Sequence, residues 1–384
     1  MKKKRPALRF SGFDNDWEQR KLGDVADKVI EKNADLTVQE TFTNSAEFGV
    51  VSQRDFFDHD ITNVNNIGGY YVVKNEDFVY NPRISVTAPV GPVNRNKLGR
   101  DGVISPLYTV FRTHDIDTTY LDWFFKSGYW HSFMYFNGDS GARSDRFSIK
   151  DSVFFEMPIP MPTLKEQRKI GAWMDSLDHL ITLHRCECKK LICIKKSMLE
   201  NMFPQKGEKI PRIRFSGFTD DWEQRKLGEV LQTLPFENFI KTPEQDGEYE
   251  IIQQGNEPIL GFAKGMPCTD YRDVVIFGDH TMSLYKPHQP FFIATDGVRI
   301  IKGKQKMDGF YLMAMLERYR PQSEGYKRYY SILTNTECFF TENWTEQQQI
   351  GIYFRQLDHL ITLHQRKLEK LQNIKKAMLE KMFV

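Results

Sequence analysis

The stretch LDHLITLH occurs twice in this chain, at Leu177–His184 and again at Leu357–His364. It lies inside a longer repeat, because residues 165–203 and 345–383 are identical at 22 of 39 positions with a constant offset of 180. Such identity shows an internal duplication. Since two long units are too few for a solenoid, we expect them to form a pseudo-dimer with internal two-fold symmetry.

Each copy of this stretch predicts a long amphipathic helix. Leu, Ile, His and Met recur with the 4-3-4-3 spacing that is typical of a coiled-coil seam. Thr163 and Asn343 stand at matching N-cap positions, each with a glutamate three residues later, as in a capping box. Two like helices related by a two-fold axis pack antiparallel, and about 36 residues give a rod of about 50 Å. The expected seam residues are Leu177, Ile181, His184, Leu191, Met198, Leu357, Ile361, His364, Leu371 and Met378.

A second duplication marks the beginning of each copy. RFSGFDNDWEQRKLG at Arg9–Gly23 returns as RFSGFTDDWEQRKLG at Arg214–Gly228. The order along the chain is therefore opening phrase, variable block and helix, twice over. The variable blocks, residues 26–162 and 231–342, show no alignment by eye. We call the repeated opening phrases and helices the frame; the two copies of the frame are alike, and the blocks between its parts differ.

Both variable blocks carry the mixed strand and helix signals of an α+β domain. The first block predicts a helix at 121–136 and the second a helix at Gly309–Arg318. The expected strands are Tyr70–Val73, Phe78–Tyr80, Tyr108–Phe111, Glu250–Ile252, Val274–Phe277, Phe291–Ala294 and Val298–Ile301. The fold class is therefore α+β, with two α+β domains separated by two long antiparallel coiled-coil helices. The expected boundaries are 1–162 and 205–342 for the domains and 163–204 and 343–384 for the helices.

Composition restricts the compartment and the partner. Three of the five cysteines, Cys186, Cys188 and Cys193, fall in the first helix, where a disulfide framework is implausible. No apolar run approaches the roughly 20 residues of a membrane span, so we expect a cytoplasmic protein with no membrane partner. The net charge is only +2, so binding to nucleic acid would depend on local basic surface.

Motifs for catalysis or cofactor binding are not found in the sequence. Neither GxGxxG nor GxxxxGK[ST] occurs, and we expect no cofactor. Asn81-Pro-Arg-Ile84 is similar to part of the NPP-aromatic motif of amino-methyltransferases but lacks the second proline and the aromatic residue, so we interpret it as a turn. Cys186 and Cys188 point about 200° apart on a helix, which argues against a metal cluster. His184 and His364 could meet across the seam as a buried hydrogen-bonded pair, or share a metal or act as a pH switch.

Basic residues beside small and aromatic residues in the loops are candidates for DNA contact. Arginine and lysine suit phosphate and base-edge contacts, although a solvated surface loop explains any one of them equally well. The candidates are Arg83, Arg95, Lys97, Arg143, Arg146, Lys264, Arg272, Lys302, Lys304, Lys306, Lys327 and Arg328.

Several motifs together carry a family resemblance. They are the twice-used FSGF-x3-WEQRKLG opener, KEQRKI at Lys165–Ile170, the KKxMLExMF endings at Lys195–Phe203 and Lys375–Phe383, DFVYNP at Asp77–Pro82, and Ser140–Ile149. With these motifs the whole chain resembles the DNA-specificity subunit of type I restriction-modification systems. The main matches in the second block are Gly278–His280 and Tyr326–Tyr330, which adds His280 to the candidate DNA-binding residues.

The resemblance implies two target-recognition domains, each reading one half of a bipartite double-stranded DNA target, with the helices as a ruler. It also implies a non-catalytic subunit that docks two methyltransferase (M) subunits and, through the complex, restriction (R) subunits. A rod of about 50 Å corresponds to at most about 15 base pairs, so half-sites separated by around one helical turn fit this geometry.

Two other functions remain open from the sequence. A helical adaptor with two protein-binding heads would tolerate loss of Arg143 or Lys304. A stand-alone DNA methyltransferase would bind S-adenosylmethionine as an isolated chain.

Overall fold

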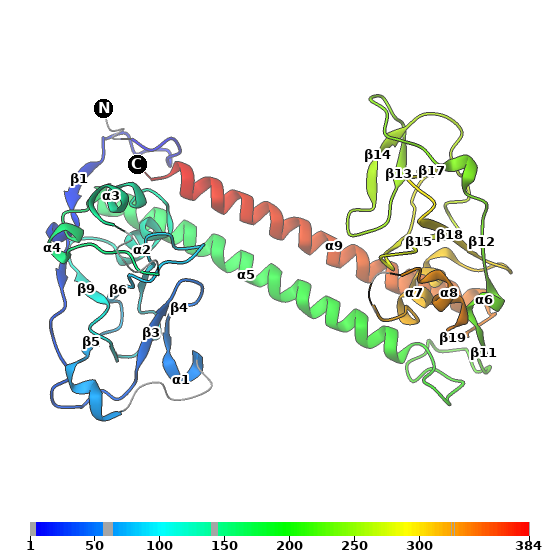
Figure 1. The fold of residues 1–384 in the computed structure, drawn as a ribbon, viewed down its shortest axis with the longest axis horizontal. Coiled ribbons are helices and arrows are strands. Elements are labelled where there is room, and N and C mark those ends of the chain that lie inside the picture. Colours follow the sequence, from blue (N-terminus) through cyan, green and yellow to red (C-terminus); the bar gives the residue numbers. More distant parts are fainter. Residues whose placement is uncertain (1–4, 57–63, 140–144, 324, 326, 384) are drawn as a thin grey trace. The chain divides into compact units, whose positions relative to one another are not determined.

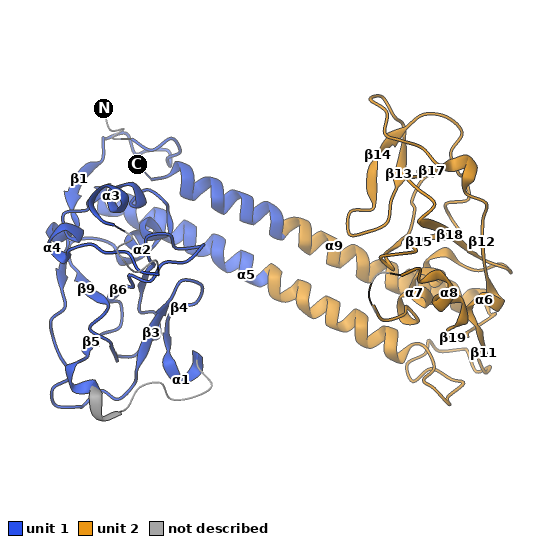
Figure 2. Ribbon diagram, in the orientation of Figure 1, with its two compact units in different colours: residues 1–183, 368–384 blue, residues 184–367 orange. Residues whose placement is uncertain are grey.

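The computed structural model describes the chain except for residues 1–4, 57–63, 140–144, 324, 326 and 384 (Figure 1). It divides into two compact units, residues 1–183 with 368–384, and residues 184–367 (Figure 2). The long helices α5 (Leu164–Asn201) and α9 (Trp344–Lys381) are each divided between the two units. The sequence predicts the two helices as segments distinct from the two domains. None of the helices in the described ranges is long and apolar enough to cross a membrane.

Unit 1 is built on a four-stranded antiparallel sheet in the order β2-β9-β6-β7. Smaller two-stranded sheets, β3-β4, β5-β8 and β1-β10, extend the domain. The strands are β1 (Glu18–Lys21), β2 (Ala26–Lys28), β3 (Phe42–Ser45), β4 (Gly49–Ser52), β5 (Tyr71–Val73), β6 (Phe78–Tyr80), β7 (Val93–Arg95), β8 (Gly102–Ile104), β9 (Thr109–Thr113) and β10 (Pro158–Met161). The helical segments are η1 (Leu22–Asp24), α1 (Gln53–Phe56), η2 (Val64–Gly69), α2 (Thr118–Lys126), α3 (His131–Asn137) and α4 (Asp151–Phe154).

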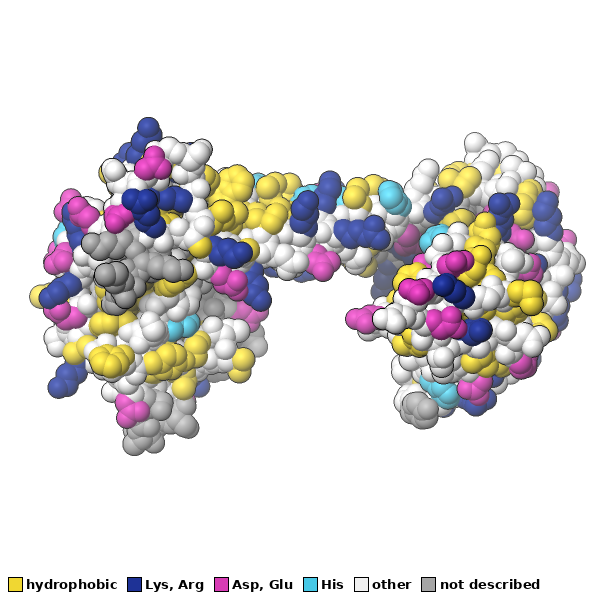
Figure 3. Space-filling model, turned by 90° about the horizontal axis from the view of Figure 1, so that it is seen from above, with side chains coloured by type: hydrophobic (Ala, Val, Ile, Leu, Met, Phe, Trp, Pro, Cys, Tyr) yellow, Lys and Arg dark blue, Asp and Glu magenta, His cyan; other side chains and the backbone are white. Residues whose placement is uncertain are grey.

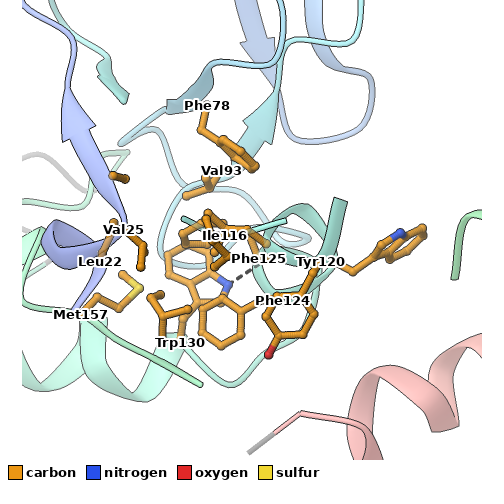
Figure 4. Close-up of a cluster of buried hydrophobic side chains, with 14 of the residues drawn as sticks. Leu22, Val25, Phe78, Val93, Ile116, Tyr120, Phe124, Phe125, Trp130 and Met157 are labelled. Atoms are coloured by element: carbon orange, nitrogen blue, oxygen red, sulfur yellow. Dashed lines mark hydrogen bonds between the residues drawn. The ribbon is translucent and has the colours of Figure 1, made fainter. Parts of the chain in front are cut away.

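The core of unit 1 lies where α2 and α3 meet this sheet. Figure 4 shows aromatic side chains of α2, among them Phe124 and Phe125, in one cluster with Phe78 of the sheet, and the rings of Phe78 and Phe125 lie 6.1 Å apart. The expected helix at 121–136 is wrong as a single element. Ser127 ends α2 because its hydroxyl donates to the carbonyl of Phe124 at 2.6 Å, and α3 begins only at His131. The break allows the Trp130 indole to turn inward, where it donates to the carbonyl of Phe125.

Unit 2 repeats this topology with a different sequence. Its main sheet has the order β12-β18-β15-β16, again antiparallel throughout, and β11 pairs with β19 as β1 pairs with β10. A third sheet, β14-β13-β17, has no three-stranded counterpart among the described residues of unit 1. The strands are β11 (Glu223–Lys226), β12 (Leu231–Thr233), β13 (Tyr249–Ile252), β14 (Ile259–Ala263), β15 (Val274–Gly278), β16 (Leu284–Tyr285), β17 (Phe291–Ile293), β18 (Val298–Gly303) and β19 (Glu337–Phe340). The helices are α6 (Leu227–Val230), η3 (Glu237–Phe239), α7 (Gly309–Arg318) and α8 (Tyr330–Asn335). The expected strands and the helix Gly309–Arg318 coincide with elements of the structure.

The long helices run antiparallel within each unit. In unit 1, Lys375 of α9 forms an ion pair with Asp178 of α5; in unit 2, Lys195 of α5 pairs with Asp358 of α9 at 2.6 Å. These are copies of one contact, since 195 + 180 = 375 and 178 + 180 = 358. The internal duplication therefore extends to individual side-chain contacts. Every residue expected in the seam is buried or half-buried.

Each long helix also ends with a phenylalanine in a domain core. Phe383, just after α9, lies 5.7 Å from Tyr120 of α2, and Phe203, just after α5, stacks 5.9 Å from Tyr311 of α7. Both phenylalanines and both tyrosines are fully buried. Each domain is thus completed by the helix end of the other copy.

The repeated opening phrase is tied to the long helices by a buried ion pair. Arg9 donates to both carboxylate oxygens of Glu166 at 2.7 and 2.8 Å, and Arg214 does the same to Glu346 at 2.6 and 3.1 Å. Both glutamates are fully buried. The expected capping box forms only in part, because the N-cap side chains accept from the glutamate amides while the carboxylates bind these arginines.

Removing one partner of this pair should destabilise its unit strongly. In Arg214→Met, Glu346 keeps its burial and loses its cation, which costs about 3–5 kcal/mol of unfolding free energy. Thermal and urea unfolding of the purified chain measures the loss. Arg225→Met is the control, since its pair with Glu223 is exposed and should contribute at most about 1 kcal/mol. Equal effects of the two substitutions would contradict this account.

Candidate nucleic-acid interface

The register of each main sheet separates the basic candidates into two groups. In unit 1, Tyr80 at the end of β6 lies opposite Thr109 and Val93, while Phe78 at its beginning lies opposite Arg95. The loop after β6 and the residue Arg95 therefore lie at opposite ends of the sheet. We call these the Pro82 end and the Arg95 end.

At the Pro82 end, the loop that follows β6 is hydrogen-bonded to the segment at residues 145–147, and we call these two segments the joined loops. The amide of Phe147 donates to the carbonyl of Pro82 at 2.8 Å, and that of Ile84 donates to the carbonyl of Asp145 at 3.0 Å. Asn81 fixes the first loop by donating its side-chain amide to the carbonyl of Asn44 at 2.8 Å. Asn81 thus acts as a structural anchor of the turn predicted here.

The joined loops bring Arg83 and Arg146 together, since the two residues form a backbone bridge. Arg83 is exposed and Arg146 half-buried, and neither has an acidic partner among the described residues. Arg146 lines a polar cavity of about 350 Å³ that also contains Lys28, Thr109 and Asp151. The Asp151 carboxylate there accepts from the Thr109 hydroxyl at 3.0 Å and forms an ion pair with Lys28. Arg143 lies outside the described residues.

Unit 2 joins the corresponding loops in the same way at what we call the Asp279 end. The amide of Tyr329 donates to the Asp279 carbonyl at 2.7 Å, as Phe147 does to Pro82, and the amide of Tyr330 donates to the Asp279 carboxylate at 2.9 Å. In both units the accepting residue lies two positions after the last core aromatic of the strand, Tyr80 or Phe277.

Three expected residues of unit 2 gather at the Asp279 end. His280 follows Asp279 directly, Lys327 lies 5.6 Å from the ring of Tyr329, and Arg328 is exposed, 3.9 Å from Asp296. A further cation, Arg299 of β18, contacts Asp279 and was missed in the sequence. The available signal was an arginine inside the otherwise apolar run of Val298–Ile301.

Arg95 does not belong to a DNA-contacting surface. Its side chain is only 7% exposed and binds Glu76 at 2.8 Å and the Thr118 hydroxyl at 2.8 Å. This burial corrects the expectation for Arg95, which holds α2 against the sheet. Lys97, at the same end, is half exposed and forms an ion pair with the buried Asp122 at 2.5 Å.

At the opposite end of the unit 2 sheet, one basic candidate pairs within the domain and two contact the repeated opening phrase and the long helix. Lys302 pairs with Asp270 at 3.3 Å, Lys304 donates to the Gly228 carbonyl at 2.8 Å, and Lys306 lies 4.0 Å from the ring of Trp344. The structure thus separates these three lysines from the Asp279 end.

The two remaining candidates of unit 2 also lie away from the Asp279 end. Arg272 is exposed beside Tyr271, just before β15 begins. Lys264 is exposed just after β14, in the separate three-stranded sheet.

The seam histidines meet in unit 2, where the Nδ1 atoms of His184 and His364 are 3.1 Å apart. Burial and then the neighbouring His364 and Lys367 lower the pKa of His184 from its usual 6.5. The described residues include no group of three or more His, Cys, Asp or Glu side chains placed to hold a metal ion. The 3.1 Å contact of the two rings has the geometry of the hydrogen-bonded pair, one of the alternatives expected from the sequence.

The lowered pKa of His184 predicts a pH dependence of stability. The unfolded chain binds a proton at a higher pH than the folded chain, so stability is lost as pH falls through about 6.5. His184→Gln should therefore gain stability relative to the parent protein as pH falls from about 7.5 to about 5. Melting temperatures across this range test it, with the exposed His179→Gln as control. Parallel profiles of His184→Gln and the parent would contradict the assignment.

Comparison with known proteins agrees with this architecture. The family described as type I restriction modification DNA specificity domain matches residues 14–192. A curated relative, the putative type I restriction enzyme MjaX specificity subunit of Methanocaldococcus jannaschii, is 22% identical over 257 residues, 60% of each chain. The chain's match thus spans less than two thirds of that relative's length.

Solved structures share the fold over nearly the full chain. The S subunit of the type I restriction-modification system from M. genitalium covers 99% of both chains, with a TM-score of 0.66 and 14% identity. A structure described for complex assembly and conformational transition of the type I R-M system covers 97% of this chain and 99% of its own, with a TM-score of 0.50 and 14% identity. The chain therefore shares its fold, two α+β domains with paired long helices, with these solved structures. The family model covers the first opening phrase, the first variable block and most of α5, and the second half of the chain lies outside its match.

Proposed function

We propose that this chain is the non-catalytic DNA-specificity subunit of a type I restriction-modification complex. Each α+β domain reads one half of a bipartite target in double-stranded DNA, and the long helices set the gap between the halves. The helices also dock two methyltransferase subunits, and restriction subunits join through the complex, which acts on DNA in the cytoplasm.

One observation carries this proposal: a duplicated frame holds two domains with the same sheet order and different loops. The joined loops occupy matching positions, with Phe147 bonded to Pro82 in unit 1 and Tyr329 bonded to Asp279 in unit 2. A protein that bound the same ligand twice would have no need of different loops. Two unlike half-sites account for the difference.

The distribution of charge supports DNA as the ligand. Although the net charge is only +2, Arg83 and Arg146 gather at the Pro82 end, and Lys327 and Arg328 gather at the Asp279 end. Local clusters of this kind neutralise phosphates, which supplies most of the salt-dependent affinity for a duplex.

Methylome mapping tests the proposal directly. The chain is co-expressed with its cognate methyltransferase subunit in a host that lacks other adenine methylases, and methyladenine is mapped across the genome. We expect one bipartite motif with a fixed gap. A stable complex that methylates no defined motif would favour a protein-binding adaptor and reject the proposal.

The exposed faces of the long helices supply the proposed docking surface. Leu180 and Leu183 are 42% and 45% exposed, and their copies Leu360 and Leu363 are 41% and 38% exposed. Apolar side chains lie beside lysines and arginines on the surface of these helices (Figure 3). Exposed apolar side chains repeated in both copies fit one partner that binds twice.

Introducing a charge on this face should remove methyltransferase copies one at a time. We expect Leu180→Glu or Leu360→Glu to retain one methyltransferase subunit and the double variant to retain none, because each buries a carboxylate in an apolar contact. Light scattering of the purified complexes gives the stoichiometry. Arg185→Glu, exposed on a different face of α5, is the control. Two methyltransferase subunits bound to the double variant would exclude this surface.

A further inference from the structure

Arg299 is the second residue of β18 and lies between two apolar residues. It lies in β18 opposite Phe277 of β15, at the Asp279 end of the unit 2 sheet. Its flanking residues Val298 and Ile300 are fully buried, whereas 21% of the Arg299 side chain remains exposed. The strand therefore presents a single guanidinium at the surface that carries the joined loops.

The guanidinium of Arg299 is held in place on several sides. Its Nη2 donates to the Asp279 carboxylate at 3.4 Å, and its central carbon lies 5.3 Å from the ring of Phe236 and 5.8 Å from that of Tyr330. An arginine fixed in this way loses little rotamer freedom when it binds a ligand, so more of the contact energy appears as affinity.

Asp279 can hold Arg299 because Asp279 is itself fixed. Only 1% of the residue is exposed, and its carboxylate accepts from the Tyr330 amide at 2.9 Å while its own amide donates to the Gly297 carbonyl at 2.8 Å. The aspartate therefore joins the strand that carries Arg299 to the loop that carries Lys327 and Arg328.

The hydrogen bonds of Arg299 are not completed by the described part of the protein. Its Nε is buried without a partner there, so the Nη groups carry the donors that could reach a ligand. One bond to Asp279 also leaves most of the donor fork unused. A planar fork of donors matches the O6 and N7 acceptors of guanine in the major groove.

We propose that Arg299 reads a guanine in the half-site bound by unit 2, with Asp279 as the positioning residue. This inference rests on the proposed function and assigns a base-reading residue to it. The position is specific to one domain, because Thr109 occupies the matching place in unit 1, opposite Tyr80, and donates to Asp151. The two domains thus place different chemistry at the same point of one sheet.

Substitution of Arg299 in the methyltransferase complex tests the inference. In Arg299→Gln, one guanine position in one half-site should lose discrimination by roughly 5- to 150-fold, while the other half-site and the gap stay unchanged. The unchanged half-site is an internal control for folding. Lys302→Gln, at the opposite end of the same sheet, should leave the motif as it is.

A modified duplex separates direct contact from support of the loop. The parent complex should bind the duplex less tightly when that guanine is replaced by 7-deazaguanine, which lacks the N7 acceptor. The Arg299→Gln complex should bind both duplexes with the same affinity. If Arg299→Gln forms no stable complex, Arg299→Lys keeps the charge and is measured in its place, with a smaller loss of discrimination at the same guanine expected because lysine lacks the planar fork.

Two outcomes would overturn the assignment of Arg299. One is an unchanged motif in the variant; the other is weaker methylation at every site with base preference intact, which would leave Arg299 a purely structural role. Failure of the proposed function looks different, because the parent complex would then show no bipartite motif at all.

Discussion

The buried ion pair between the opening phrase and the long helix is the constraint on which the rest of the structure depends. Glu166 and Glu346 are fully buried at the first turn of their helices, and each needs the bidentate arginine that the opening phrase supplies. A buried carboxylate does not tolerate a missing partner, so the phrase and the helix have to be duplicated together. The duplication therefore fixes where each variable domain leaves the frame and where it returns.

How far the sequence predicts this structure depends on how local each signal is. The helices could be predicted because their 4-3-4-3 spacing is continuous over many turns, and the strands because apolar runs are bounded by turn residues. The single helix expected at 121–136 was wrong because its apolar pattern continues through a break made by one side-chain hydrogen bond of Ser127. The hydrophobic periodicity of a sequence does not reveal a capping bond of this kind.

The candidate site was predicted less well, for a related reason. Residue type marks Arg83, Arg95 and Lys304 as equally basic, but their roles depend on the sheet end at which the register places them. Arg95 is buried against Glu76, and Lys304 holds the frame through Gly228. Arg299 was missed because a cation flanked by apolar residues looks like a solvated surface residue until its partner 20 positions away is known.

The two sheet ends explain how one frame can carry different specificities. At the far end of the unit 2 sheet, Lys304 and Lys306 contact Gly228 and Trp344, residues of the repeated frame, so substitutions there disturb the attachment of the domain. At the Asp279 end the joined loops bond to each other through the carbonyl and the carboxylate of Asp279. Side chains at that end are therefore free to change without loosening the frame. The same sheet can then present threonine in one domain and arginine in the other, and specificity changes while the scaffold stays constant.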